Sequence, residues 1–340
     1  MPGAAWWVED GGGVLSSGFF GQAALEPSHR PLLNTTPWDL ASLTKSLATA
    51  VLLVQCHRRG ELDLEAPASA WLPELREAVA GQARLMDLAR HRAGLPAWRP
   101  LYVGSGSLAN YLSRIGAEKA TATGELYSDL DYIVLGAVLE RAVGQPLPAI
   151  FHERVALPLG LLRTGFNAPH RYPDAAATET AGVFEAGLAG AEPGTPPFDR
   201  RIAAGETHDG NAAALGGAAG HAGLFGPVDE VAGLVRAILR TSPLDLGDAG
   251  RQWLFRPGPG GRRTVGFVTA AGSRAARGIL DASCPGHEGF TGTSVWLDPA
   301  RDRFYLLLSN RIHPRVEGDF QPVRRAFHRV AAAARAAAGS

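Results

Sequence analysis

An apolar run within residues 41–54 begins with a serine and a lysine three positions apart. Ser42 and Lys45 precede the run LATAVLLV at residues 47–54. A helix that is apolar on every side is buried, and side chains at positions i and i+3 lie on the same helix face. The pattern therefore predicts a central buried helix, ending near Gly60, that holds the Ser42 hydroxyl beside the Lys45 amine.

This pair has the residue types of nucleophilic catalysis. A serine hydroxyl needs a group that takes its proton, and burial can lower a lysine pKa by ~3–5 units. Lysine is also a rare choice in this chain, because Lys45 and Lys119 are its only lysines among 33 lysines and arginines. Arginine could not replace it as a base, since it stays protonated. The alternative is an ordinary helix start, because S-x-x-K also occurs by chance.

Composition excludes several classes of function. The formal net charge is zero and no basic block stands out, which disfavours a nucleic-acid partner. No apolar run reaches the length of a membrane span, and residues 1–7 lack a signal-peptide pattern. We expect a cytoplasmic protein by default, or a periplasmic or extracellular one if the start is truncated. Cys56 and Cys284 do not make a disulfide framework.

Strand patterns lie at both ends of the chain and helix patterns lie between them. We therefore expect one α/β (α+β) domain over residues 1–340, in which an antiparallel sheet from the terminal segments is flanked by helices. Residues 1–58 and 255–340 would form the sheet subdomain and 59–254 a mainly helical inserted subdomain. Expected strands are 4–8, 14–19, 264–269, 294–297 and 304–308; expected helices are 85–92, 108–115, 130–143, 149–157, 228–239 and 324–338, with a long loop region over 167–226.

Two further motifs could complete a site with the serine. Tyr127-Ser128-Asp129 stands just before the helix at 130–143, where the tyrosine could relay a proton; the alternative is a simple N-cap. The glycine-containing stretch at 286–294 runs into a strand and could bring a backbone N–H close to a substrate. The last expected helix, 324–338, has a basic face that could meet a membrane, but covering one side of the sheet is favoured.

The three motifs together resemble the serine β-lactamase and penicillin-binding-protein superfamily, in its class C-like branch of DD-peptidases, D-aminopeptidases and esterases. Ser42 to Lys45 matches S-x-x-K. Tyr127-Ser128-Asp129 matches the Y-x-N position, and His287-Glu288-Gly289 matches K-T-G in the H-x-G form. The resemblance spans residues 3 to 312 and implies the sheet-and-helix fold of that superfamily.

The resemblance also implies a role for each residue. Ser42 would form an acyl-enzyme, with Lys45 taking its proton alone or with Tyr127. Tyr127 would protonate the leaving group and help to activate the deacylating water. The backbone N–H groups of Ser42 and Phe290 would form the oxyanion hole, and no cofactor or metal would be needed. A rival metallohydrolase reading would use three other residues, His208, Asp209 and His221, whose spacing is not a recognised ligand pattern.

Departures from the family pattern bear on the substrate. Asp129 stands where asparagine is usual, and a carboxylate beside Lys45 favours its charged form unless Asp129 turns away. A neutral His287 and an acidic Glu288 make a poor site for the carboxylate that β-lactamases hold there. Glu288 could instead face a substrate amine, unless strand alternation points it outward.

The expected substrate-binding residues are Asp129, His287, Glu288 and Gly289, with Asn211 and His221 from the loop region. The predicted function is a serine hydrolase for small-molecule esters or for D-amino-acid-containing peptides and amides. A true β-lactamase or a D-Ala-D-Ala carboxypeptidase is the alternative within the class. A penicillin-binding sensor without turnover is the alternative outside it.

Overall fold

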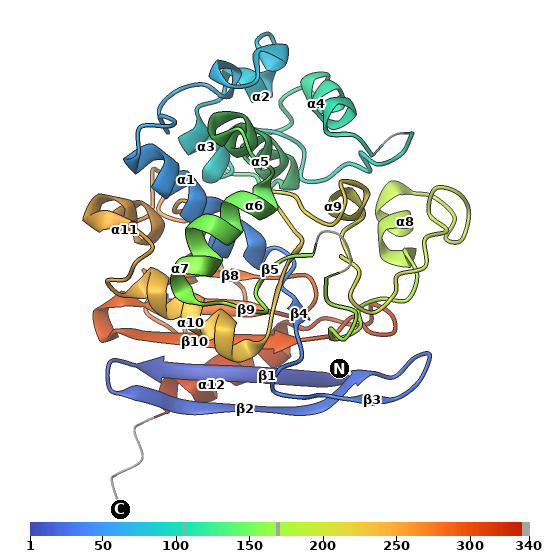
Figure 1. Cartoon of the computed structure of the whole chain (residues 1–340), viewed down its shortest axis with the longest axis vertical. Coiled ribbons are helices and arrows are strands. Elements are labelled where there is room, and N and C mark those ends of the chain that lie inside the picture. The colour runs from blue at the N-terminus through green and yellow to red at the C-terminus, as the bar shows by residue number, and fades with distance from the viewer. Residues whose placement is uncertain (105, 168–170, 335–340) are drawn as a thin grey trace, which may run out of the picture.

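The two ends of the chain form one seven-stranded antiparallel sheet (Figure 1). The computed structural model describes residues 1–104, 106–167 and 171–334. The strand order is β3-β2-β1-β10-β9-β8-β7, and Trp6 of β1 pairs with Leu307 of β10, which joins the termini. The strands are β1 (Gly3–Asp10), β2 (Gly13–Ala24), β3 (Arg30–Pro31), β7 (Val268–Thr269), β8 (Pro285–Glu288), β9 (Ser294–Asp298) and β10 (Arg303–Ser309).

The predicted hairpins are confirmed, and one predicted strand is wrong. β1 pairs with β2 and β9 with β10, where expected. The strand predicted over 264–269 is reduced to the two residues of β7, because residues 264–267 close a turn in which Thr264 N–H donates to the Phe267 carbonyl. β7 nevertheless pairs with β8, so β8 is one strand in from the sheet edge.

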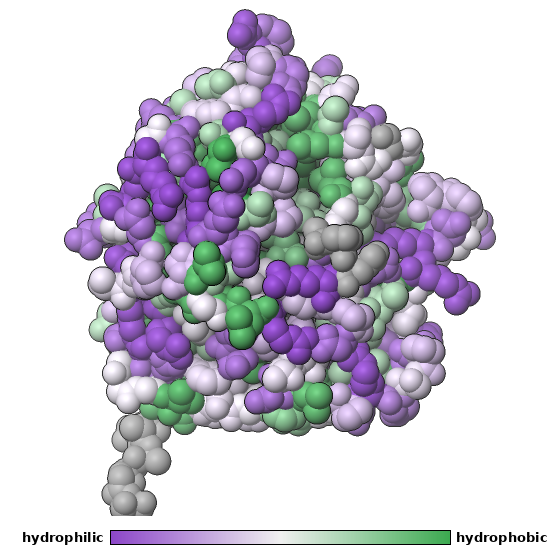
Figure 2. Space-filling model, viewed as in Figure 1, coloured by the Kyte–Doolittle hydropathy of each residue, from purple (hydrophilic) through white to green (hydrophobic). Residues whose placement is uncertain are grey.

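Helices cover the sheet and fill the region above it (Figure 1). α10 contacts β1 and β10, and α12 contacts β10. Hydrophilic residues cover most of the face seen in Figure 2, with hydrophobic residues in small separate groups. The helices are α1 (Ala50–Arg58), α2 (Val79–Gln82), α3 (Leu85–Ala89), α4 (Leu108–Gly116), α5 (Asp129–Val143), α6 (Leu147–Phe151), α7 (Leu157–Leu159), α8 (Val183–Ala189), α9 (Gly210–Ala214), α10 (Val228–Leu239), α11 (Gly247–Phe255) and α12 (Gln321–Ala333).

The last helix covers the sheet, as the sequence favoured. Its buried residues Arg324, His328 and Ala331 follow the i, i+4, i+7 spacing of one helix face. α12 begins three residues before the predicted start, at Gln321. Residues 335–338 of the prediction lie outside the described residues.

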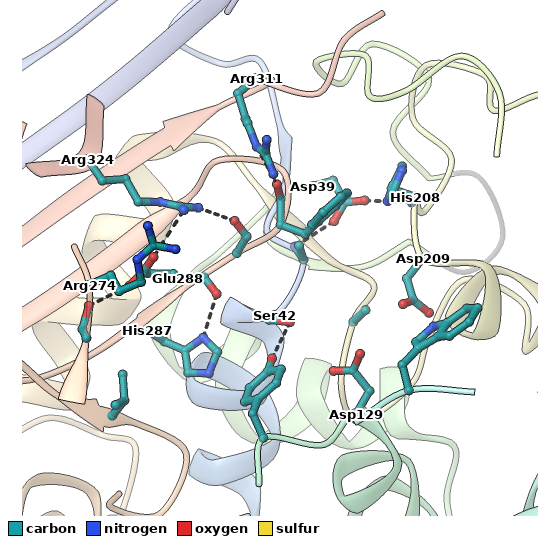
Figure 3. Close-up of a pocket in the computed structure, with 18 of the residues that line it drawn as sticks. Asp39, Ser42, Asp129, His208, Asp209, Arg274, His287, Glu288, Arg311 and Arg324 are labelled. Carbon is teal, nitrogen blue, oxygen red and sulfur yellow. Dashed lines mark hydrogen bonds and ion pairs between the residues drawn. The ribbon is translucent and has the colours of Figure 1, made fainter. Parts of the chain in front are cut away.

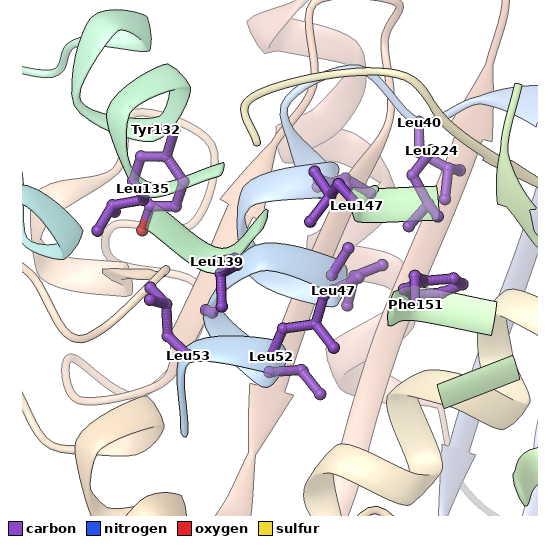
Figure 4. Packing of buried hydrophobic residues seen from close by; sticks show 14 of the residues in the cluster. Leu40, Leu47, Leu52, Leu53, Tyr132, Leu135, Leu139, Leu147, Phe151 and Leu224 are labelled. Atoms are coloured by element: carbon purple, nitrogen blue, oxygen red, sulfur yellow. The ribbon is translucent and has the colours of Figure 1, made fainter. Parts of the chain in front are cut away.

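The predicted central helix is the core of the molecule. It continues from a π-helical turn, η1 (Lys45–Thr49), into α1, and every residue from Lys45 to Cys56 is buried. Leu47, Leu52 and Leu53 lie in one buried cluster with residues of α5 and α6 (Figure 4). A π-helical turn is rare and often marks a functional site.

Three other expectations are corrected. The helix predicted over 85–92 ends at Ala89, and the one predicted over 149–157 is split into α6, a π-helical turn (His152–Ala156) and α7. The long region predicted as loop contains α8, α9 and β6 (Leu224–Gly226). β6 lies between β4 (Trp38–Asp39) and β5 (Gly165–Phe166) in a second, three-stranded sheet.

No single helix in the described part of the chain has the length and apolar composition of a membrane span. α5 and the segment Leu147–Leu159 meet those two criteria only as a pair, bent by 75°.

Replacing Gly220 with alanine is expected to lower the free energy of unfolding by about 2 kcal/mol, since overpacking typically costs about 1–3 kcal/mol. A Cβ at Gly220 would overlap the carbonyl oxygen of Tyr132 and touch the backbone of Gly136, both in α5. Urea unfolding measures the change. Gly233→Ala in α10 is the control, because only the tip of Arg236 lies near its Cβ; an equal loss there would contradict the packing argument.

Candidate active site

Ser42 stands at a sharp junction between strand and helix. Asp39 ends β4, and its carboxylate accepts a hydrogen bond from Ala41 N–H at 2.8 Å. Ala41 has a φ of 47°, which is unfavourable for a residue other than glycine. The turn closes when Lys45 N–H donates to the Ser42 carbonyl at 3.1 Å. Such strained residues cluster at active sites, and here the strain lies directly before the candidate nucleophile.

The Ser42 hydroxyl is held between the lysine and the tyrosine that the sequence singled out. Lys45 Nζ donates to Ser42 Oγ at 2.8 Å. Tyr127 Oη donates to the same oxygen at 2.8 Å, and a dashed line marks this hydrogen bond at Ser42 in Figure 3. The three side chains come from η1, its preceding turn and the loop before α5. Both candidates for taking the serine proton are therefore within hydrogen-bond reach of it.

Asp129 does not turn away from Lys45. Its carboxylate forms an ion pair with Lys45 Nζ at 2.7 Å, and the His221 carbonyl accepts a further hydrogen bond from Nζ at 3.2 Å. With its hydrogen bond to Ser42, the ammonium therefore makes two hydrogen bonds and one ion pair. Burial lowers the pKa of Lys45, but the charge and hydrogen bonding of Asp129, with a further contribution from Tyr127, outweigh it and raise the pKa above its usual value.

Tyr127 is fixed from behind by a buried pair that the sequence reasoning missed. The His91 ring lies 4.6 Å from the Tyr127 ring, and His91 Nδ1 lies 3.1 Å from the Asp131 carboxylate. Ser128 caps α5 by accepting from Asp131 N–H, so the N-cap interpretation is confirmed beside the proton-relay one. The only signal in the sequence was an acidic residue within the apolar stretch of 130–143.

Burial controls the protonation of this pair. Desolvation, with the nearby Arg263 and Lys45 cations, holds the pKa of His91 well below its usual range. Desolvation and the Asp129 charge raise the pKa of Asp131 well above its usual range. Burial also raises the pKa of Tyr127, against the lowering effect of the Lys45 charge. Tyr127 therefore carries its proton in the resting site and can donate it.

His287 lies on β8 facing the cavity, and it is neutral at physiological pH. Burial and the Lys45 and Arg263 charges lower its pKa to about 3. Its Nδ1 lies 2.9 Å from the Glu288 carbonyl, and its ring lies 5.8 Å from that of Tyr127. A neutral histidine at this position agrees with the sequence interpretation.

Glu288, the acidic residue expected to face the substrate, already has partners within the protein. Its carboxylate lies 3.3 Å from Arg324 Nη1 and accepts hydrogen bonds from Ser273 Oγ at 2.7 Å and Gln321 Nε2 at 2.6 Å. These partners occupy both oxygens. The charge of Glu288 is therefore compensated within the protein, so it repels a substrate carboxylate less than an unpaired carboxylate would. Its oxygens are also already occupied, so they are not free to bind a substrate amine.

Two backbone N–H groups suit the expected oxyanion hole. Within residues 1–104, 106–167 and 171–334, neither Ser42 N–H nor Phe290 N–H has a hydrogen-bond acceptor. Both residues line the same cavity. Gly289, between Glu288 and Phe290, has no room for a side chain, because a Cβ there would overlap the Thr293 hydroxyl.

Two predicted substrate-binding residues lie behind the cavity wall. The Asn211 side chain accepts from Leu101 N–H at 2.8 Å and donates to the Arg99 carbonyl at 2.9 Å, so it holds a loop and does not line the cavity. His221 lies behind Asp209, to which it is bonded through Nε2 at 2.8 Å. Both are better described as positioning residues.

The structure brings two residues of the metallohydrolase triad, Asp209 and His221, into contact, but His208 has another partner. His208 pairs with Glu179 at 3.0 Å, whereas His221 pairs with Asp209. No group of three or more His, Cys, Asp or Glu side chains in the described ranges is arranged as a metal site. Of the triad, His208 and Asp209 line the cavity.

The cavity above Ser42 has a volume of about 480 Å³, within the range of small-molecule sites. Trp98, Phe184 and Leu188 give it an apolar part. Sequence reasoning missed these residues, and it missed four arginines that also line the cavity, Arg263, Arg274, Arg311 and Arg324. They come from segments with no motif, so only the tertiary structure gathers them.

The fold combines an antiparallel sheet with inserted helices, and its site holds a serine between a lysine and a tyrosine. This combination defines a serine hydrolase. The chain belongs to the β-lactamase family, because the family model described as Beta-lactamase matches residues 1–328. The resemblance seen in the three sequence motifs is thereby confirmed.

Curated relatives carry hydrolase names. An N-acetylmuramyl-L-alanine amidase of Bacillus subtilis (strain 168) is 28% identical over 350 residues, covering 92% of this chain and 78% of that protein. A putative D-alanyl-D-alanine carboxypeptidase of Escherichia coli (strain K12) is 28% identical over 307 residues, covering 82% of this chain and 70% of that protein.

Solved structures support the fold. EstCE1, a hydrolase with promiscuous acyltransferase activity, superposes with a TM-score of 0.73 at 23% identity, covering 98% of this chain and 93% of that one. A class C β-lactamase from Rhodobacter sphaeroides superposes with a TM-score of 0.67 at 19% identity, covering 97% and 94%. The predicted fold class is therefore confirmed.

Proposed function

We propose that this protein hydrolyses amide bonds of small amino-acid or peptide derivatives through an acyl-enzyme on Ser42. The observation that carries the proposal is the pair of hydrogen bonds, both 2.8 Å long, from Lys45 and Tyr127 to Ser42 Oγ. A serine placed between two proton carriers can lose its proton as it attacks and can return one to the leaving group.

The reaction follows from these contacts in two halves. Ser42 Oγ bonds to the substrate carbonyl carbon, and its proton passes to Lys45 or Tyr127 once that group is deprotonated. The N–H groups of Ser42 and Phe290 hold the oxyanion; losing one such donor typically costs ~2.7–4 kcal/mol of barrier. Tyr127 protonates the leaving nitrogen, the C–N bond breaks, and water then attacks the ester and frees Ser42.

Two considerations favour an acyclic amide over the cyclic amide of a β-lactam as the substrate. The relatives named amidase and carboxypeptidase cover most of this chain. His287 is uncharged and Glu288 is committed to Arg324, so these two positions provide no cation for the carboxylate of a β-lactam. An ester hydrolase is the second candidate, since an open site with an acyl-enzyme serine also cleaves esters, which have better leaving groups.

A panel of four substrates tests the proposal. We expect turnover of a p-nitrophenyl ester and of D-alanine p-nitroanilide or an acyl-D-Ala-D-Ala peptide, and nitrocefin hydrolysis far below that of a dedicated β-lactamase. Ester turnover without any amide turnover would favour the esterase. Rapid nitrocefin turnover would contradict the interpretation of residues 287 and 288.

A further inference from the structure

The two backbone N–H groups of the expected oxyanion hole come from segments far apart in the chain. Ser42 N–H follows β4, whereas Phe290 N–H lies in the β8–β9 loop, residues 289–293. A donor stabilises an oxyanion only at about 2.7–3.1 Å from the charged atom, and a misplacement of about 1 Å can cost on the order of 10²-fold in rate. Contacts between the two segments must therefore hold the spacing of these N–H groups.

Two buried threonines of the β8–β9 loop make such contacts. Thr291 Oγ1 donates to the Asp39 carbonyl at 2.8 Å, and Thr293 Oγ1 donates to the Leu40 carbonyl at 3.2 Å. Neither threonine lines the cavity, and they are only 1% and 0% exposed, so substrate does not reach them. Among the described residues, these are the only hydrogen bonds that join the loop to the segment from β4 to Ser42.

The two hydroxyls bind the chain directly before its strained turn. The carbonyls of Asp39 and Leu40 belong to the two residues that precede Ala41, whose φ is 47°. A strained residue keeps its conformation only when its surroundings hold it there. The hydroxyls therefore fix the segment that carries Ser42 N–H, as well as its distance from the loop.

The β8–β9 loop is tightly closed, so two anchors fix it as one unit. Gly289 N–H donates to the Thr293 carbonyl at 2.8 Å, and Gly292 N–H donates to the Gly289 carbonyl at 3.1 Å. A Cβ on Gly289 would also lie 2.8 Å from the Leu40 carbonyl oxygen. Glycine at this position therefore lets the loop approach the segment before Ser42 closely enough for the hydroxyls to reach it.

Arg324 of α12 sets the direction of the second N–H group. Its Nη2 donates to the Gly289 carbonyl, and to the Thr293 carbonyl at 3.1 Å. The Gly289 carbonyl and Phe290 N–H belong to one trans peptide group, in which the C=O and N–H bonds lie in one plane and point in opposite directions. Because the carbonyl faces Arg324, the N–H points away from that side chain.

We propose that Thr291 and Thr293 are positioning residues that fix the spacing of the two oxyanion donors, Ser42 N–H and Phe290 N–H. Each hydroxyl acts through the backbone that it holds. The pair therefore contributes to stabilising the transition state and makes no contact with the substrate. This inference rests on the proposed function, because the oxyanion forms when Ser42 is acylated.

An ester and its thiono analogue test this role, because they differ only in the atom that the two N–H groups hold. p-Nitrophenyl acetate places an oxygen there, and p-nitrophenyl thionoacetate places a sulfur, which is larger and a weak hydrogen-bond acceptor. Release of p-nitrophenolate gives kcat/KM for both, and the uncatalysed rates correct for intrinsic reactivity. We expect the wild type to prefer the oxygen ester by about 10²-fold or more, as for the loss of one oxyanion donor.

Valine variants remove each hydroxyl and keep the shape of the side chain. Thr291→Val and Thr293→Val are each expected to lower the oxygen-to-sulfur ratio by about tenfold, because a donor displaced by a fraction of an ångström loses more on oxygen than on sulfur. Thr291→Ser keeps the hydroxyl and should keep the wild-type ratio. Thr269→Val is the matched control, since it removes a buried hydroxyl of β7 that donates to the Gly261 carbonyl at 3.3 Å.

The ratio does not depend on how much of each variant is folded, because the same active molecules hydrolyse both esters. The two positions are tested separately, so a valine variant that fails to fold leaves the other to decide. A ratio that keeps its wild-type value in the valine variants, or that falls as far in Thr269→Val, would overturn the inference alone. If the wild type hydrolyses neither ester and Ser42 is not acylated, the proposed function fails as well.

Discussion

Ser42→Ala is expected to lower hydrolysis by on the order of 10⁴-fold or more, and to abolish covalent labelling by a fluorophosphonate. The hydroxyl is the atom on which the hydrogen bonds from Lys45 and Tyr127 converge. Its removal leaves the backbone N–H groups and the cavity intact, so substrate binding can persist while the acyl-enzyme cannot form.

Intact mass measures the labelling directly. Wild-type protein should gain one adduct, and Ser42→Ala should gain none. Ser17→Ala, at an exposed position of β2, is the matched control and should label as the wild type does. An equal adduct on Ser42→Ala would place the nucleophile elsewhere. An unlabelled wild type would instead favour a binding protein that has the fold without turnover.

The parts of the site that the sequence predicted are those built from near neighbours in the chain. Ser42 and Lys45 are one turn apart, so helix geometry alone brings them together. Asp129 follows Tyr127 by two residues at the start of α5, so one segment brings Tyr127 to Ser42 and Asp129 to Lys45. The sheet could be predicted for the same reason, because its hairpins join neighbouring strands through short turns at each end of the chain.

The parts that the sequence did not predict depend on partners from distant segments. The sequence shows Glu288 only as an acidic residue in the motif at 287–289, but α12 brings Arg324 to it from 36 positions further along the chain. Asn211 and His221 read as cavity residues, yet their side chains bond to Arg99 and Asp209. Residues 167–226 lack helical periodicity because glycine and alanine dominate them, so α8 and α9 gave no signal.

Asp129→Asn is expected to move the rising limb of the pH profile of kcat/KM to lower pH, by about 1 unit or more, as for the loss of a directly paired charge. A general base works only when deprotonated, so activity rises with pH toward its pKa. The Asp129 charge raises the pKa of both candidate bases, Lys45 and Tyr127. Asparagine removes that charge, so the limb moves the same way whichever group takes the serine proton.

The same substitution also changes how the free energy of unfolding depends on pH. In the wild type, the raised pKa of Lys45 contributes stability that is present below the unfolded pKa and is lost as pH rises through the folded pKa. Without Asp129, burial should push the folded pKa of Lys45 below the unfolded value of about 10.4. The unfolded chain then binds more protons between those two pKa values, so the free energy of unfolding of the variant should rise with pH there.

Urea unfolding and kcat/KM, each measured from pH 6 to 10, check both parts. The control is Asp63→Asn, at an exposed position after α1, which removes one carboxylate and should leave the pH profiles of activity and stability unchanged. Asp131→Asn is unsuitable as a control because it would disturb the buried pair with His91. A rising limb that stays in place, or moves to higher pH, would show that Asp129 does not control the proton acceptor of Ser42. A limb that moves as expected, while the variant gains stability with pH, ties the ion pair between Lys45 and Asp129 to both the fold and the reaction.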